Sequence, residues 1–435
     1  MNSLLNLGVM MALCAVTTLM SAKGIAVFND ATRPMVLEYK EKRLTRSALG
    51  TSAFAFGIGY ILGFIPQSIA TGIIIIHVVL LGTDIVGTYI SESKYQTAIS
   101  LVVGATYGVV MALGIPVIDK IFSILPYNFL PQLGQVSSII LLAFAVFPCL
   151  VVSLQYGWKK GIITFSITIL AQVVVSQYGK FTLNSGQTIA INANAMALFF
   201  GMVAMIFFAV RDKREASNTQ ATLVSIFAER IKSIKKYWYL FAISGGLIAL
   251  SAALKLTVES PMSAPLYQSG DFYSAAITEL ARVIGFIPLV VTTGIATGTY
   301  SPAGVKMVFV IGSLAALVGN PFLALIFGAI WMVMEVFLLE SFAKMLDKFP
   351  GVKDCGDQIR TAITKVLEVA LLVGGITAAA AIAPSWGAMF VVGLYVLNNT
   401  FKKKIVSLAI GPVGAILVGV IANILVVLNL MNMPV

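Results

Sequence analysis

The sequence predicts an all-α polytopic membrane protein with about 11 to 14 transmembrane or re-entrant helices, arranged as two inverted repeats. Three observations support this prediction. The composition is strongly apolar, the apolar runs are continuous over about twenty residues, and a motif from the first half of the chain returns in the second half.

The composition excludes a soluble globular protein. Of 435 residues, 59% are hydrophobic and only 11% are charged, with a mean hydropathy of +0.95, whereas soluble domains carry about 25% charged residues. The apolar runs do not alternate with polar residues, which favours membrane helices over a β-barrel. The net charge of +11 comes from short loops, so it indicates orientation in a lipid bilayer and not binding to nucleic acid.

Fourteen apolar segments follow one another, and each is an expected helix or half-helix. Leu4 to Met20 lacks a preceding basic region, which indicates a first span and not a cleaved signal peptide. The segments lie near 3–22, 48–69, 71–90, 96–117, 136–156, 161–179, 188–210, 237–256, 274–296, 304–319, 321–343, 361–382, 384–399 and 405–430.

The basic residues predict the orientation. If the loops alternate between the two sides of the membrane, every basic cluster falls on one side, including the connection 211–236. The positive-inside rule makes that side cytoplasmic, so both termini are expected in the periplasm. The chain then divides into a first repeat (1–210), a basic cytoplasmic connector (211–236) and a second repeat (237–435). Within the connector, Leu223 to Ile234 has the pattern of an amphipathic helix.

The repeat is carried by Gly63 to Ile73, GFIPQSIATGI, which returns 222 positions later as GFIPLVVTTGI, Gly285 to Ile295. Seven of the eleven positions are identical, and both copies contain a proline, Pro66 and Pro288, to which we assign a structural or gating role. The copies lie in the second and ninth segments, and this odd offset predicts inverted halves. Chance similarity between membrane helices is the alternative.

Each copy opens a hairpin with a tip of small residues, on the outer side in the first half and on the inner side in the second. Opposed hairpins of this kind are typical of elevator-type carriers. Thr71 and Gly72, and in the second copy Thr293 and Gly294, are candidate binding residues, because irregular backbone at membrane depth is tolerated where it lines a cavity. Close helix packing through glycine is the competing interpretation.

Two ionisable residues share one face of the third segment. His77 and Asp84 are seven positions apart, about 10 Å along a helix, and ionisable groups inside a membrane are functional candidates. Asp84 is a candidate for binding a proton or a sodium ion, and His77 for titrating near neutral pH. The alternative is that both side chains only bond to neighbouring helices.

The ninth segment carries Glu279 and Arg282 one helical turn apart. Such a pair can neutralise itself, or Arg282 can face an anionic substrate with its forked donors. Asn194, at the start of the seventh segment, is a further binding candidate, although an interhelical hydrogen bond is the more common role. Glu335 stands alone among apolar residues, and the sequence assigns it no role.

The sequence shows no enzyme motif and no cofactor site. A P-loop, Gly-x-Ser-x-Gly and HExxH are all missing. One histidine and three scattered cysteines (Cys14, Cys149 and Cys355) form neither a metal-ligand spacing nor a disulfide framework. We therefore expect a protein that is not an enzyme and needs no metal.

Several longer strings resemble the YhfT family of bacterial inner-membrane proteins over nearly the whole chain. The strings are AVFNDATRP (26–34), GTDIVG (82–87), AVFPCLVVSLQYGWK (145–159), IGFIPLVVTTGIATGTY (284–300), FPGVKDCGDQIRTAI (349–363) and LEVALLVG (367–374). The resemblance implies a transport protein with no assigned substrate. It places Asp30, Arg33 and Asp84 in family-like strings and His77 outside them. Asp30 and Arg33 also fit a structural clasp at a helix start.

The sequence thus predicts a homodimeric, elevator-like secondary transporter of a small polar or anionic metabolite in a bacterial inner membrane. Two alternatives remain open. The chain could be a permease subunit similar to those for ascorbate or galactitol in the phosphotransferase system, working with separate soluble partners, or a membrane enzyme or scaffold that transports nothing.

Overall fold

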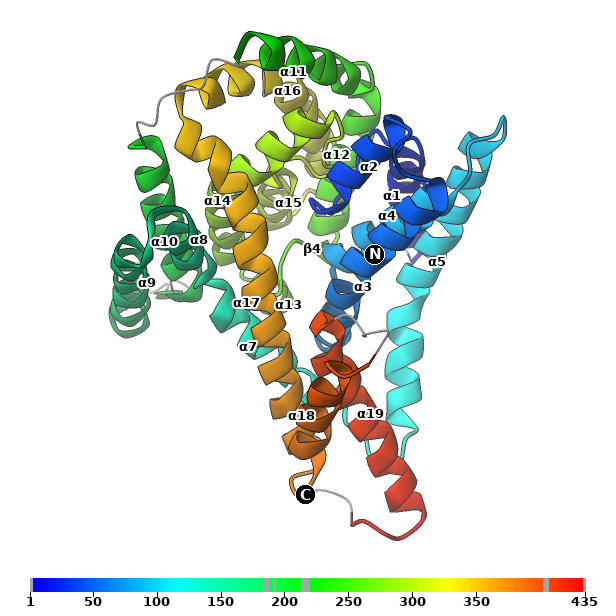
Figure 1. Cartoon of the computed structure of the whole chain (residues 1–435). Coiled ribbons are helices and arrows are strands. Elements are labelled where there is room, and N and C mark those ends of the chain that lie inside the picture. Colours follow the sequence, from blue (N-terminus) through cyan, green and yellow to red (C-terminus); the bar gives the residue numbers. More distant parts are fainter. Residues whose placement is uncertain (1–2, 183–187, 191–192, 213–219, 402–406, 433–435) are drawn as a thin grey trace.

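The structure, a computed structural model, describes residues 3–182, 188–190, 193–212, 220–401 and 407–432 and consists almost entirely of α-helices (Figure 1). Before the basic connector lie α1 (Ser3–Ala22), α2 (Thr32–Lys40), α3 (Arg46–Thr71), α4 (Ile76–Tyr89), α5 (Gln96–Ser123), α6 (Leu130–Leu133), α7 (Gln135–Phe144), α8 (Phe147–Tyr156), α9 (Trp158–Tyr178) and α10 (Ala193–Val210). From the connector onward come α11 (Gln220–Lys235), α12 (Trp238–Ala253), α13 (Ala264–Ser269), α14 (Phe272–Thr297), α15 (Met307–Val318), α16 (Pro321–Lys348), α17 (Pro350–Ile382), α18 (Gly387–Asn398) and α19 (Ser407–Val427).

The helices confirm a polytopic membrane protein. Among the described residues, six helices are long and apolar enough to cross a membrane, and the bent helices α3 and α14 qualify when the two pieces of each are taken together. The same described ranges contain six shorter apolar helices of 10–17 residues. Each of the fourteen predicted segments overlaps one of these helices, with three differences. The segment 136–156 is broken into α7 and α8, and the segments 71–90 and 188–210 contain short strands, Ile74–Ile75 and Thr188–Ala190, before their helices.

The helices α1 to α5 pack together as a first region. α1 lies along α5 and α4, and α3 packs against α4. Close approach depends on a small residue, because a Cβ at Gly104 of α5 would lie 2.6 Å from the carbonyl oxygen of Cys14 in α1.

The helices α12 to α16 pack together as a second region with the same order of contacts. α12 lies along α16 and α15, and α14 packs against α15. Here a Cβ at Gly328 of α16 would lie 2.7 Å from the carbonyl oxygen of Gly245 in α12. The two regions therefore use the same kind of close glycine contact at corresponding places.

Four non-helical stretches, 23–31 and 72–75 in the first region and 254–263 and 298–306 in the second, meet between the regions. β1 (Ile74–Ile75) pairs in parallel with β4 (Thr257–Val258), and Ala26 forms a parallel bridge with Tyr300. Each stretch thus finds backbone partners in the other region in addition to its local turns, as backbone removed from water requires.

The hairpin tips expected from the sequence lie next to the stretches that pair between the two regions. Ser68, in the first tip, is 3% exposed and Ser301, in the second, is 1% exposed, whereas Gly72 at the end of the first tip is exposed. The placement of the two tips on opposite sides of the membrane stays a prediction.

The two repeated prolines lie close to the bends of their helices. α3 bends by 41° between Ile58 and Gly63, and α14 bends by 53° between Ile284 and Leu289. A proline cannot donate to the carbonyl four residues earlier and clashes with it. For Pro66 and Pro288 that carbonyl belongs to residues 62 and 284, at the bends.

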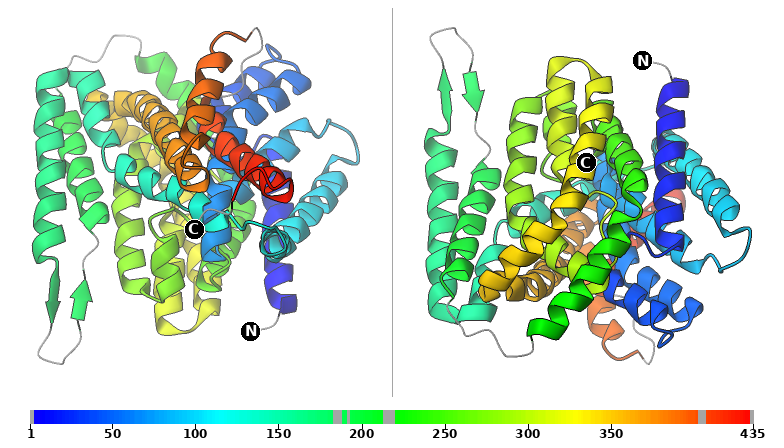
Figure 2. Two further views of the ribbon diagram at one scale, coloured as in Figure 1. Left: turned by 90° about the horizontal axis from the view of Figure 1, so that it is seen from below. Right: turned by 90° about the horizontal axis from the view of Figure 1, so that it is seen from above.

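The remaining helices surround these two regions. The long helix α17 packs against α7, α8, α14 and α19, and α9 pairs with α10. β2 (Lys180–Thr182) and β3 (Thr188–Ala190) pair antiparallel and project beyond the helical body (Figure 2). α11, which covers the predicted amphipathic stretch, lies against α16 and α14 and buries Ile231 and Ile234. Connector residues 213–219 and the basic residues 402–404 lie outside the described part of the chain.

Candidate functional site

A buried group of three charged side chains lies where the non-helical stretches of the second region meet α14. Glu259 is fully buried, and its two carboxylate oxygens receive Arg282 and Lys306. The distance from Arg282 Nη2 to Glu259 Oε1 is 3.0 Å, Arg282 Nε bonds to the other oxygen, and Lys306 Nζ lies 2.6 Å from Oε1. We call these three residues the central triad; its two cations face one carboxylate.

Lys306 reaches the central triad from an unusual backbone position. It is the residue before α15 and has φ +78°, in the left-handed region that favours glycine. Its ammonium group lies 4.1 Å from the ring centre of Phe286 and 5.5 Å from that of Phe28. Strained backbone that positions a buried cation over aromatic rings is typical of a functional site.

His77 adjoins the central triad. It lies in the first turn of α4, with its ring 4.9 Å from that of Phe28 and 5.1 Å from that of Phe64. The imidazole interacts electrostatically with all three triad residues. Its Nδ1 is buried and has no hydrogen-bond partner among the described residues. His77, for which the sequence gave two readings, therefore lies beside the cluster.

Glu279 and Arg282 are not each other's main partners. The carboxylate of Glu259 receives Arg282, and Glu279 accepts the hydroxyl of Ser263 at its Oε1. The oxygens of Ser260 and Ser263 are 2.8 Å apart, so hydroxyl groups lead from the stretch 254–263 to Glu279. The other oxygen of Glu279, Oε2, is buried without a partner among the described residues.

Arg33 connects the two regions. Its Nη1 lies 2.6 Å from Asp30 Oδ1 and donates to Thr293 Oγ1, also at 2.6 Å. The same guanidinium bonds to the carbonyl oxygens of Val27 and Phe28 in its own stretch, and to that of Val290 in α14. Arg33 is 1% exposed, so this buried connection holds the start of α2 against α14.

Asp84 belongs to the neighbourhood of Arg33. Its Oδ2 accepts the backbone N–H of Asn29 at 2.9 Å, and its carboxylate interacts with the Arg33 guanidinium and the Asp30 carboxylate. The carboxylate therefore fixes the stretch 23–31 against α4. Through Asp30, this group also interacts with Lys306 of the central triad.

The other sequence candidates are spread over several places. Thr71 is half-buried and donates to the Gln67 carbonyl oxygen, while Gly72, which ends α3 with φ +67°, is exposed. Gly294 is required by packing, because a Cβ there would lie 2.5 Å from the Tyr300 ring. Asn194 accepts Gln172 Nε2 at 2.7 Å, a bond between α10 and α9 that lies outside the central triad.

Glu335 holds the stretch 298–306 in place. Its carboxylate accepts the Tyr300 hydroxyl at 2.5 Å, the Val305 N–H at 2.7 Å and the Trp331 indole N–H at 2.8 Å. Lys306 directly follows Val305, so this carboxylate helps to position the triad lysine.

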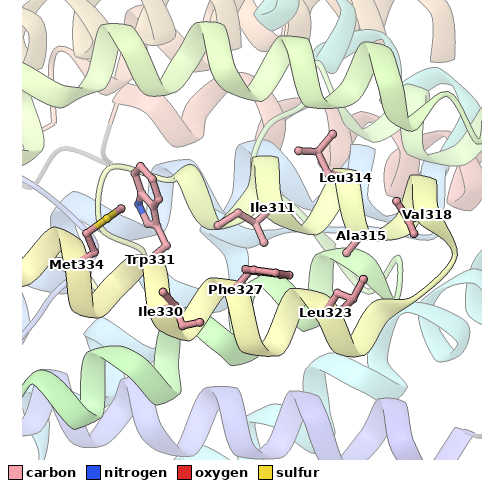
Figure 3. A pocket seen from close by; sticks show the side chains of 9 residues that line it. All are labelled: Ile311, Leu314, Ala315, Val318, Leu323, Phe327, Ile330, Trp331 and Met334. Atoms are coloured by element: carbon pink, nitrogen blue, oxygen red, sulfur yellow. The ribbon is translucent and has the colours of Figure 1, made fainter.

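An apolar pocket of about 390 Å³ between α15 and α16 offers little to a polar ligand (Figure 3). Figure 3 shows side chains of the two helices facing each other across it. The lining residues are Ile311, Leu314, Ala315, Val318, Leu323, Phe327, Ile330, Trp331 and Met334.

Reasoning from the sequence missed Glu259, Lys306 and Ser263. Glu259 lies between the predicted segments 237–256 and 274–296, Lys306 lies at the start of the segment 304–319, and neither belongs to a periodic pattern. One signal was available: Pro34-Met35 and Pro261-Met262 follow corresponding breaks in the two halves, and matched interruptions of apolar segments point to a binding site.

The arrangement suits binding of a small anion. The N-terminal ends of α4 and α15 lie at His77 and Lys306, so two helix dipoles add positive potential to the two cations. No group of three or more His, Cys, Asp or Glu side chains that could hold a metal ion occurs within the described ranges.

Comparison with known proteins supports a single family. The model of the YhfT family, described as a protein of unknown function, matches residues 6–431. The chain is 31% identical over 438 residues to the protein "Uncharacterized protein YhfT" of Escherichia coli (strain K12), and the alignment covers 97% of each chain. No solved structure matches the chain.

Proposed function

The chain belongs to the YhfT family, and from the site that it builds we propose that it is a secondary active transporter of a small anionic metabolite. The single observation that carries this proposal is the central triad, in which Arg282 and Lys306 share the carboxylate of Glu259 deep between broken helices. Transporters bind substrates at such interruptions, where half-helix N-termini face anionic groups.

The substrate anion would share the two cations with Glu259. A carboxylate or phosphate matches the forked donors of Arg282 and the point charge of Lys306. Two cations face one carboxylate, so the central triad keeps one positive charge that a monovalent anion neutralises. Because Glu259 stays paired with the cations after the anion leaves, binding can be reversible.

We further propose that the first and second regions are inverted copies that move as an elevator in a homodimer. The support is internal: both regions share the order of helix contacts, the proline bends, and non-helical stretches that pair with the other region. In this proposal α17 and its neighbours form the fixed scaffold in a bacterial inner membrane, with both termini in the periplasm.

The first test is a thermal-shift screen of the purified protein with acetate, succinate, citrate and inorganic phosphate. An anion that binds the folded state raises the melting temperature by mass action. We expect at least one of these anions to do so, and we expect Arg282→Gln and Lys306→Gln each to remove the shift. Lys255→Gln is the matched control, because this exposed lysine lies in the stretch 254–263 but outside the triad.

The second test is uptake of the best-binding anion into proteoliposomes. Uptake driven by an ion gradient supports the carrier. Uptake that requires phosphoenolpyruvate and gives a phosphorylated product would instead support a phosphotransferase-type permease, and conversion without uptake would support an enzyme. Equal anion binding by the wild type and by both triad variants would refute the assigned site.

A further inference from the structure

We propose that Glu279 is the proton-carrying group of this site, so that the transporter is a proton–anion symporter. The symport part of this inference rests on the proposed function, because it requires that the protein transports an anion. Its geometric basis is independent of any substrate, because it concerns how the buried acids of the described structure are satisfied.

Four buried acids can be compared by their partners. Glu259 faces two cations, Glu335 accepts three hydrogen bonds, and Asp84 accepts a backbone N–H beside a guanidinium group. Glu279 is 1% exposed, accepts one hydroxyl from Ser263, faces the acidic side chain of Glu259, and leaves Oε2 without a hydrogen-bond donor in the described part of the chain. A buried carboxylate with so few donors costs much less when it carries a proton.

The charged groups around Glu279 also favour its protonated form. The titratable or charged side chains that interact with it are Glu259 from the stretch 254–263, Arg282 from its own helix and Tyr267 from α13. Lys306, from the stretch before α15, bonds to the Glu259 carboxylate, which separates it from Glu279. Two neighbouring carboxylates favour sharing one proton. Because Glu259 is paired with both cations, the proton belongs on Glu279.

The hydroxyl groups of Ser263 and Ser260 offer a path for that proton. Ser263 donates to Glu279 Oε1, and its oxygen lies 2.8 Å from that of Ser260. Both serines are fully buried and lie on the stretch that also carries Glu259. A movement of this stretch would therefore change the triad and the proton site together.

Charge balance links the proton to the anion. With Glu279 protonated, the two cations and Glu259 leave one positive charge, which a monovalent anion neutralises. With Glu279 ionised, the same anion would leave the buried site with a net negative charge. Proton binding and anion binding therefore favour each other, and this reciprocity is the thermodynamic basis of symport.

The first experiment needs no substrate. Infrared spectra of the purified protein in lipid are recorded as the pH is raised, and the C=O stretch of protonated carboxyl groups is followed. We expect a titrating band that is lost in Glu279→Gln and retained in Asp84→Asn, the matched substitution at another buried acid. Ser263→Ala should move the midpoint pH of the band, and it provides a second test if Glu279→Gln folds poorly.

A band that Glu279→Gln leaves unchanged, or that Asp84→Asn removes, would overturn the proton site while leaving the anion carrier intact.

The second experiment repeats the thermal-shift titration with acetate and inorganic phosphate over roughly pH 6 to 9. In the wild type the apparent affinity should fall by up to about tenfold per pH unit once the proton is lost. In Glu279→Gln it should not change with pH, and an unchanged pH dependence in this variant would also refute the proposal.

Discussion

The first and second regions share a backbone design but carry different charges. After α1, Gly24 has φ +60° and donates to the Ser21 carbonyl oxygen; after α12, Lys255 has φ +61° and donates to that of Ala252. In both regions the next N–H closes the same turn, from Ile25 to Met20 O and from Leu256 to Ser251 O. The helices α1 and α12 thus end in the same way although the residues at the two turns differ.

The charged side chains of the two regions have different kinds of bonding partner. In the first region, Arg33 bonds mainly to backbone carbonyl oxygens and to Thr293, which fixes structure. In the second region, the Glu259 carboxylate bonds to the side chains of Arg282 and Lys306, the two cations to which we assign anion binding. The comparison teaches that backbone hydrogen bonds preserve the architecture while side-chain chemistry is free to differ between the regions.

The largest expected effect is at the central triad. Glu259→Gln leaves two buried cations without a counter-charge and should lower the free energy of unfolding by about 3–5 kcal/mol. Unfolding in detergent micelles, followed by heat or denaturant, measures this loss. Glu340→Gln, which removes an exposed acid of α16, should leave the free energy of unfolding nearly unchanged, because water and salt screen an exposed ion pair. Equal losses in the two variants would show that the triad is not a buried charge cluster.

A smaller effect is expected at Arg33 in the first region. Arg33→Lys keeps the positive charge but cannot reproduce the forked set of bonds to backbone oxygens and Thr293. We expect a loss of about 1.5–3 kcal/mol in stability, with little change in anion affinity. Unfolding in detergent micelles measures the stability of Arg33→Lys, and the thermal-shift titration with the same anions measures its anion affinity. A loss of anion binding without a loss of stability would assign Arg33 to the ligand site and erase the contrast between the regions.

The sequence predicted the helices well because they have strong local signals. Continuous apolar runs located the helices to within a few residues, and Pro66 and Pro288, to which the sequence assigned a structural or gating role, lie near the bends of α3 and α14. Intramembrane charge also identified Arg282, Glu279 and His77 as residues of interest. Each of these inferences needs only a short window of sequence.

The centre of the site could not be predicted in the same way. Glu259 and Lys306 lie in stretches without helical periodicity, and their burial depends on pairing with segments far away in the chain, such as Thr257 with Ile74. Lys306 also adopts a backbone conformation that its residue type disfavours. The burial of these residues depends on tertiary contacts, so the local sequence around them predicts only an ordinary loop.

The matched turns after α1 and α12 permit a reciprocal test. Gly24→Ala places a Cβ at positive φ and 3.0 Å from Val36 Cγ1, so it should destabilise the protein by about 1–2 kcal/mol. Lys255→Gly relieves the same backbone strain and should be neutral or stabilising by up to about 1 kcal/mol. Thermal unfolding of both variants checks the signs. Two destabilising variants of equal size would mean that the turns are not equivalent.

The smallest expected effect concerns the C-terminal end of α14, which receives two cations. Lys40 Nζ lies 3.4 Å from the Gly298 carbonyl oxygen, and Arg230 bonds to that of Ala296. Lys40→Gln should cost about 0.3–1 kcal/mol, because a cation there complements the helix dipole. The loss should shrink at high salt, since partly exposed charges are screened. Lys42→Gln, an exposed neighbour, is the control; an equal, salt-independent loss in both variants would mean that Lys40 acts through α2 and not through α14.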